Sequence, residues 1–213
     1  MRTRIKVCGI TDREQALAIA ALGVDALGFI FVAASPRCVA AAQVRDIVAV
    51  LPPFVSTVGV FMDHDPGLVN EIAHSCGLSM VQLHGKESPE YCRAMQLPVL
   101  KAFRVGPEAL PELAPYGRVA KGFLLDTYRP GQAGGTGATF DWELVGRLAL
   151  PGPLLLAGGL TPDNVGPAIR RLRPWAVDVN SGVELSPGRK DLAQVERLVA
   201  EVRLADLAPP LPS

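Results

Sequence analysis

The chain has 213 residues, and 49% of them are hydrophobic, which suffices for one sizeable core. Lysine plus arginine and aspartate plus glutamate each total 21, so the formal net charge is zero. This balance excludes the strong electrostatic attraction by which basic proteins bind nucleic acids or anionic membranes.

The N-terminal sequence MRTRIKVCGITDREQ becomes charged where a signal peptide would carry its apolar segment. No later apolar run approaches the roughly 18 residues of a membrane span, so we expect a cytoplasmic protein. The four cysteines, at positions 8, 38, 76 and 92, form no C-x-x-C motif, and no histidine stands at metal-ligand spacing. We therefore expect neither disulfides nor a metal site, and no cofactor is indicated.

Short β-rich runs alternate along the chain with stretches whose apolar residues recur at helical spacing. Most of these helical stretches have Asp or Thr near the start, and all have Gly or Pro near the end, as helix caps require; they cover residues 12–23, 41–52, 65–77 and 161–174. The predicted strands are RIKVCG (4–9), DALGFIFV (25–32), PFVSTVGVF (53–61), SMVQLHG (79–85), PVLKAF (98–103), KGFLLD (121–126), PLLLAGG (153–159) and AVDVNSG (176–182).

Eight strand-and-crossover units in a chain of this size favour a single-domain α/β fold, the (β/α)8 TIM barrel. A doubly wound sheet more often stops at about five to seven strands. No shift in composition marks a domain boundary, so we assign residues 1–203 to one barrel domain. Residues 204–213, which end in LAPPLPS, are predicted to be a loose C-terminal tail.

Polar residues stand at the carboxyl ends of strands that should be apolar, because both faces of a parallel barrel are covered. Side chains two residues apart share a face, which pairs Lys6 with Cys8, Gln82 with His84, Leu124 with Asp126, and Asp178 with Asn180. If these faces point inward, the second residue of each pair rings the barrel mouth, and the polar first residues lie one layer below. The active sites of such barrels form at that mouth.

Each of these residues also has a structural interpretation. A lone cysteine on a strand is commonly a small core residue, and Asp126 could cap the loop that follows it. Gln82 and His84 could be hydrogen-bonded polar groups of the barrel. Their convergence on one rim favours a functional site over unrelated structural roles.

Three glycine-rich loops and one arginine complete the pattern. LAGGLTPDNV (156–165) and NSGVELSPGRKD (180–191) follow the last two strands, where barrels often bind phosphate through backbone N–H groups and a helix N-terminus. We interpret YRPGQAGGTGATFDW (128–142) as a mobile cover over the mouth. Arg37, in AASPRC after the second strand, could bind a carboxylate, although a solvated loop arginine is the simpler alternative. The whole set fits proton transfer on a phosphorylated small molecule.

The motifs KVCGIT, SPR, VGVF, VQLHG, LLD, GGTGATFDW, LAGGLTPDNV and DVNSGVELSPGRKD, in this order between residues 4 and 191, resemble those of phosphoribosylanthranilate isomerase of tryptophan biosynthesis. The resemblance implies an Amadori rearrangement of N-(5-phosphoribosyl)anthranilate to 1-(2-carboxyphenylamino)-1-deoxyribulose 5-phosphate. It implies catalysis by Asp126 as general acid and Cys8 as general base. It also implies that Arg37 binds the anthranilate carboxylate, that Gln82, His84 and Asp178 contact the ribose and anthranilate, and that Gly158, Gly159, Ser181 and Gly182 hold the phosphate.

This chemistry makes opposite demands on the two catalytic groups. Asp126 must hold a proton although the pKa of a free aspartic acid is about 3.9, whereas Cys8 must become a thiolate from a pKa of about 8.5. Lys6, two residues before Cys8, is the first candidate to favour the thiolate. Two residues depart from the family pattern beside the site, namely Cys38, where a larger side chain is usual, and Asn180, where a small or apolar one is usual.

Several alternatives stay open. The histidine-pathway isomerase performs the same rearrangement but carries an aspartate at the end of its first strand, and indole-glycerol phosphate synthase needs a lysine acid and a longer N-terminal segment. A noncatalytic phosphate-binding barrel or a regulatory thiol protein are further alternatives from another class. The expected partner is a small phosphorylated substrate, with no nucleic acid and no membrane, and the chain is expected to be a monomer or a homodimer.

Overall fold

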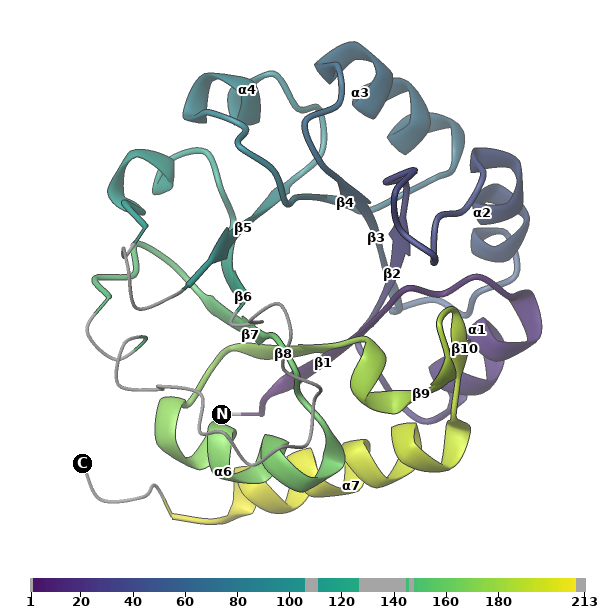
Figure 1. The fold of residues 1–213 in the computed structure, drawn as a ribbon, viewed down its shortest axis with the longest axis vertical. Coiled ribbons are helices and arrows are strands. Elements are labelled where there is room, and N and C mark those ends of the chain that lie inside the picture. Colours follow the sequence, from purple (N-terminus) through teal and green to yellow (C-terminus); the bar gives the residue numbers. More distant parts are fainter. Residues whose placement is uncertain (1, 106–110, 127–144, 146–147, 210–213) are drawn as a thin grey trace.

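Parallel strands close into a barrel with helices around its outside (Figure 1). The computed structural model describes residues 2–105, 111–126, 145 and 148–209. Within these residues, eight strands follow one another around the barrel in chain order. They are β1 (Arg4–Cys8), β2 (Ala26–Ile30), β3 (Ser56–Phe61), β4 (Met80–Leu83), β5 (Val99–Arg104), β6 (Gly122–Asp126), β7 (Leu154–Ala157) and β8 (Ala176–Val179). All eight predicted strands and the (β/α)8 fold are confirmed.

The helices cover the barrel from outside and begin at the caps that the sequence indicates. Asp12 and Asp65 each accept hydrogen bonds from backbone N–H groups of the first turn that follows. The helices are α1 (Arg13–Ala21), α2 (Ala41–Val48), α3 (Pro66–Ser75), α4 (Pro89–Arg93), α6 (Pro162–Leu172) and α7 (Leu192–Leu207), with single turns η1 (Ala114–Tyr116) and η2 (Ser181–Val183) and a small hairpin of β9 (Glu184–Ser186) and β10 (Arg189–Lys190). The four predicted helices are therefore confirmed. In the described part of the chain, no helix has the length and hydrophobicity that a bilayer crossing needs.

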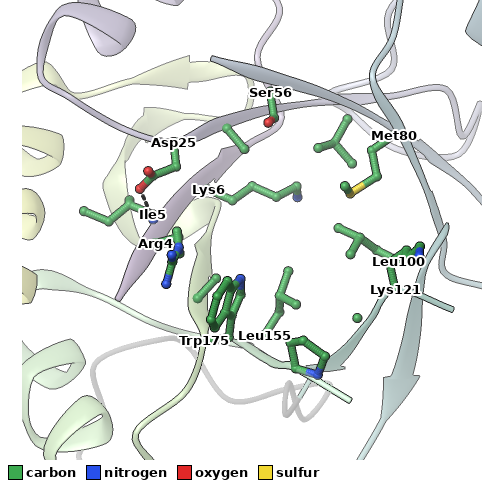
Figure 2. A pocket seen from close by; sticks show the side chains of 15 residues that line it. Arg4, Ile5, Lys6, Asp25, Ser56, Met80, Leu100, Lys121, Leu155 and Trp175 are labelled. Atoms are coloured by element: carbon green, nitrogen blue, oxygen red, sulfur yellow. Dashed lines mark hydrogen bonds between the residues drawn. The ribbon is translucent and has the colours of Figure 1, made fainter. Parts of the chain in front are cut away.

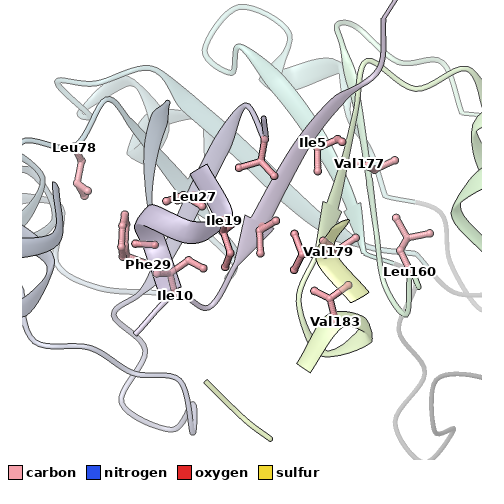
Figure 3. Close-up of a cluster of buried hydrophobic side chains, with 14 of the residues drawn as sticks. Ile5, Ile10, Ile19, Leu27, Phe29, Leu78, Leu160, Val177, Val179 and Val183 are labelled. Carbon is pink, nitrogen blue, oxygen red and sulfur yellow. The ribbon is translucent and has the colours of Figure 1, made fainter. Parts of the chain in front are cut away.

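Both faces of each strand are buried, and successive side chains alternate between them. On β1, Ile5 and Val7 face the layer between barrel and helices, where they belong to one large cluster with Val177 and Val179 of β8 (Figure 3). The intervening Lys6 faces the barrel interior. A smaller apolar cluster fills that interior, made of Val58, Leu100, Ala102, Leu124, Leu155, Ala157 and Ala176.

The predicted boundary of the C-terminal tail was placed too early. Helix α7 continues to Leu207, because Val202 and Ala205 are buried against the barrel at helical spacing. Asp206 also accepts hydrogen bonds from the backbone N (2.8 Å) and the Oγ1 (2.6 Å) of Thr3. Residues 204–207 therefore belong to the barrel domain. Residues 128–142, which the sequence predicts to be a mobile cover over the mouth, lie outside the described residues.

Candidate active site

A cavity of about 510 Å³ lies at the carboxyl ends of the barrel strands. The strand and loop geometry brings together every residue that the sequence proposes for the site. The lining includes Cys8, Arg37, Gln82, His84, Asp126, Gly158, Gly159, Asp178, Asn180, Ser181 and Gly182. In a (β/α)8 barrel this is the end at which active sites form.

Cys8 lies beside a buried ion pair that joins β1 to β8. The Lys6 Nζ donates hydrogen bonds of 2.9 Å to both carboxylate oxygens of Asp178, its partner in the parallel register. Gly28 stands opposite Cys8 on β2, and a Cβ there would lie 2.8 Å from the Cys8 Sγ and 3.0 Å from the Lys6 Nζ. The missing side chain at Gly28 therefore leaves the space in which the thiol and the ammonium lie close together.

The pKa of Cys8 is raised above its ordinary value. Burial raises this pKa more than the positive charge of Lys6 lowers it, and the carboxylate of Asp178 raises it further. Lys190 lowers it to a smaller extent. Lys6, the candidate that the sequence offers for favouring the thiolate, thus lowers the pKa of Cys8, but burial outweighs its effect in the free protein.

A second cluster of polar side chains lies at the ends of β4 and β6 and consists of Gln82, His84 and Asp126. The Gln82 Nε2 lies 3.3 Å from the His84 Nδ1, and the His84 Nε2 lies 3.3 Å from the Asp126 Oδ2. If Gln82 donates to Nδ1, the hydrogen of a neutral His84 is on Nε2 and points to Asp126. Among the described residues, the Gln82 Oε1 is buried without a hydrogen-bond partner, as expected of a group that awaits a ligand in this cavity.

Arg37 forms a bidentate ion pair that the sequence did not predict. Its Nε donates to the Glu184 Oε1 at 2.9 Å, and its Nη2 donates to the Glu184 Oε2 at 2.6 Å. The buried Lys190 Nζ donates to the same Glu184 Oε1 at 2.7 Å and to the Asn180 Oδ1 at 2.8 Å. Arg37 is therefore held in place rather than solvated, and Asn180 serves as a partner of Lys190.

Glu184 and Lys190 lie within the loop sequence NSGVELSPGRKD, yet no pattern in it connects them to Arg37. The only signal was their charge in a loop that follows a barrel strand. Glu184 and Arg37 are 147 positions apart in the chain, and the closure of the barrel brings their loops together. The sequence therefore missed the partner that holds Arg37.

The two predicted phosphate loops touch each other at the mouth. Gly158 and Gly159 have φ angles of 91° and 63°, in the left-handed region that favours glycine. Helix α6 follows them and begins with a reciprocal capping box between Thr161 and Asn164. In the neighbouring loop, any Cβ at Gly182 would collide with the Leu160 carbonyl oxygen. The loops thus form one glycine-lined wall beside a helix N-terminus, which suits an anion.

A smaller cavity of about 180 Å³ lies at the opposite end of the barrel (Figure 2). Apolar side chains such as Met80, Leu100 and Leu155 make up much of its wall, and the Lys6 side chain extends toward the middle of the barrel there. The Lys6–Asp178 ion pair therefore lies between the two cavities. Among the described residues, no group of His, Cys, Asp and Glu could hold a metal ion.

Comparison with known proteins identifies the family. A family model described as N-(5'phosphoribosyl)anthranilate (PRA) isomerase matches residues 5–201. The chain belongs to this family. A relative from Geobacter sp. (strain M21), named N-(5'-phosphoribosyl)anthranilate isomerase, is 50% identical over 202 residues, which cover 94% of this chain and 98% of the relative.

Solved structures of PRA isomerases share the fold over nearly the whole chain. One, in complex with reduced 1-(o-carboxyphenylamino)-1-deoxyribulose 5-phosphate, is 37% identical with a TM-score of 0.81 and covers 94% of this chain and 98% of its own. Another is a monomer generated from the dimeric enzyme of Thermotoga maritima, 35% identical with a TM-score of 0.80 and the same coverage of 94% and 98%. Both show that PRA isomerases have this (β/α)8 barrel.

Proposed function

We propose that this chain catalyses the isomerisation for which its family is named, within tryptophan biosynthesis. The reaction is the Amadori rearrangement of N-(5-phosphoribosyl)anthranilate to 1-(2-carboxyphenylamino)-1-deoxyribulose 5-phosphate. The observation that carries this proposal is a single cavity at the barrel mouth that contains a thiol, a carboxyl group, an arginine and two glycine loops. The family match over residues 5–201 supports it independently.

Asp126 acts as the general acid and Cys8 as the general base. Asp126 donates a proton to the furanose ring oxygen, the bond from that oxygen to C1 breaks, and C1 forms an iminium with the anthranilate nitrogen. Cys8 then removes the proton from C2, and its electrons form the C1–C2 double bond of an enolamine. The enolamine gains a proton at C1 and loses its O2 hydroxyl proton, which yields the ketone.

The buried setting of Cys8 makes it a base only when substrate is bound. In the free protein its raised pKa keeps the thiol protonated near neutral pH. Ring opening places a positive iminium beside the thiol, which favours the thiolate at the moment when the C2 proton must leave. Burial lowers the pKa of Lys6, but the charges and hydrogen bonds of Asp178 and Cys8 together raise it above its ordinary value, so Lys6 stays charged below the substrate.

The remaining groups orient the two ends of the substrate. Gly158, Gly159, Ser181 and Gly182 bind the phosphate, since they line one wall of the cavity beside the start of helix α6. Arg37 binds the anthranilate carboxylate. Gln82, His84 and Asp178 contact the ribose and the anthranilate, and the unpartnered Gln82 Oε1 supports such a contact.

The decisive experiment is a turnover assay with the purified chain, no metal and no cofactor added. Phosphoribosylanthranilate is fluorescent, and we expect its fluorescence to decay well above the spontaneous rate. The histidine-pathway substrate, tested in parallel, shows whether the site accepts a second aminoaldose. Decay at the spontaneous rate, with the protein folded, would contradict the proposed function.

We also propose where the chain acts and in which oligomeric state. We place the chain in the cytoplasm, because a phosphorylated substrate is charged and does not cross a membrane unaided. The expected state is a monomer or a homodimer, and the dimeric relative from Thermotoga maritima supports the second. Light scattering of the purified chain distinguishes them. No nucleic acid or membrane partner is proposed.

A further inference from the structure

We infer that Glu184 is a positioning residue: it fixes the Arg37 guanidinium so that the guanidinium can bind the substrate carboxylate with its outer edge. This inference rests on the proposed function and concerns a residue that does not itself touch the substrate. The inference starts from the bidentate ion pair, in which the Arg37 Nε donates to Glu184 at 2.9 Å and the Arg37 Nη2 donates to it at 2.6 Å.

The contact leaves one edge of the guanidinium for a ligand. A guanidinium has five N–H donors, and Glu184 accepts two of them. The remaining donors are on Nη1 and Nη2, which together form the second edge that a carboxylate can bind in a bidentate way. Because Glu184 occupies the first edge, it determines the plane and direction of the second.

Glu184 can do this only because it is itself held. Its side chain is 4% exposed and that of Lys190 is 0% exposed, and the Lys190 Nζ donates to the Glu184 Oε1 at 2.7 Å. The backbone N of Gly188 donates to the same oxygen at 3.2 Å. Although burial favours the protonated acid, the hydrogen bonds from Arg37 and Lys190 lower the pKa of Glu184, so it stays an anion.

The cluster also spans the loops on either side of the site. The Lys190 Nζ donates to the backbone O and the Oδ1 of Asn180, directly before the phosphate loop. A Cβ at Gly9, after β1, would lie 2.7 Å from the Asn180 Oδ1 and 2.8 Å from the Arg37 Cδ. Arg37 is therefore packed against the loop that follows Cys8, which further restricts where its side chain can lie.

The test compares two substrates in the full-length protein. One is phosphoribosylanthranilate, and the other is phosphoribosylaniline, which lacks the carboxylate and is followed by chromatography. In Glu184→Gln we expect kcat/KM for the first substrate to fall about 10- to 100-fold, mainly through KM, as for a lost charged hydrogen bond. For the second substrate we expect a change below about 3-fold. Wild-type turnover of phosphoribosylanthranilate is the separate check on the proposed function.

Two further variants isolate the role of Arg37. In an Arg37→Met background, Glu184→Gln should cause no further loss, because both changes remove the same interaction. Arg37→Lys should behave like Arg37→Met toward the carboxylate substrate, because one ammonium cannot present two edges. If Glu184→Gln does not fold, Glu184→Asp, which keeps the charge but withdraws the carboxylate from Arg37, should give the same loss on the carboxylate substrate alone.

The matched control is Glu90→Gln, which removes the carboxylate of an exposed ion pair with Arg93. It should leave both substrates unaffected. Equal losses on both substrates in Glu184→Gln, a full additional loss in the Arg37→Met background, or full activity of Arg37→Lys would each overturn the inference.

Discussion

The two ends of the barrel share the same strands but differ in chemistry. At the carboxyl end, strand ends and loops supply a thiol, carboxyl groups, an imidazole and a guanidinium around a cavity of about 510 Å³. At the amino end, the cavity of about 180 Å³ has a more apolar wall (Figure 2). The difference follows from chain direction, because every parallel strand delivers its following loop to the same end. The reactive side chains therefore gather at the end to which the strands run.

The Lys6–Asp178 ion pair marks the boundary between these ends. Lys6 lines the amino-end cavity and Asp178 lines the carboxyl-end cavity. Their side chains are only 3% and 8% exposed. Substitutions at the carboxyl end should therefore change turnover, whereas substitutions at the pair and at the amino end should change the free energy of unfolding.

The largest expected effect is on turnover at the carboxyl end. Cys8→Ala and Asp126→Ala should each lower kcat by about 100-fold or more, because each removes a proton-transfer group. KM should change far less. The measurement is steady-state kinetics by the fluorescence assay, and a rise in KM with kcat unchanged would contradict the assigned roles.

At the boundary, Lys6→Met should lower the free energy of unfolding by about 3–5 kcal/mol, because it leaves the Asp178 carboxylate buried without its cation. Urea unfolding measures this effect. The control is Lys121→Met, an exposed lysine at the amino-end cavity, which should change the free energy by less than about 0.5 kcal/mol. Similar values for both variants would remove the distinction between the boundary and the amino end.

The pH dependence of kcat/KM should show its alkaline limb above the pKa of an exposed thiol. The active form, with Asp126 protonated and Cys8 ionised, has as many protons as the form with Asp126 ionised and Cys8 protonated. The fraction of the enzyme in the active form is therefore constant until the second group also loses its proton. That group is Cys8, whose pKa is raised by burial.

The rate at which iodoacetamide alkylates Cys8 should rise with pH over the same range, since only the thiolate reacts. Peptide mapping distinguishes Cys8 from the exposed Cys38. If the alkaline limb of kcat/KM, or the midpoint of the rise in alkylation rate with pH, lay at or below the pKa of an ordinary thiol, the free protein would stabilise the thiolate.

The smallest effect is expected at the amino end. The Arg4 guanidinium lies 3.7 Å from the centre of the Trp175 ring, and Trp175 is 40% exposed. Trp175→Leu should lower the free energy of unfolding by about 0.5–1 kcal/mol and leave kcat/KM unchanged. Thermal and urea unfolding, together with the turnover assay, provide the check. A large loss of activity would mean that the two ends are coupled.

Much of the site could be predicted because it depends on local patterns. Cys8 and Asp126 end two strands, and the alternation of side chains places each on the inner face. The glycine loops follow the last two barrel strands, where the fold binds phosphate. The end of helix α7 was missed, because the buried contacts of Ala205 outweighed a tail-like composition.

The sequence by itself determined the barrel, the identity of the groups at its mouth and the resemblance to PRA isomerases, because strand parity and motif order are written along the chain. Only the tertiary structure decided how these groups are paired and charged. The partner of Arg37 comes from a loop 147 positions away, and burial raises the pKa of Cys8 more than its neighbour Lys6 lowers it. Distances across the barrel and the loss of water appear only when the chain closes.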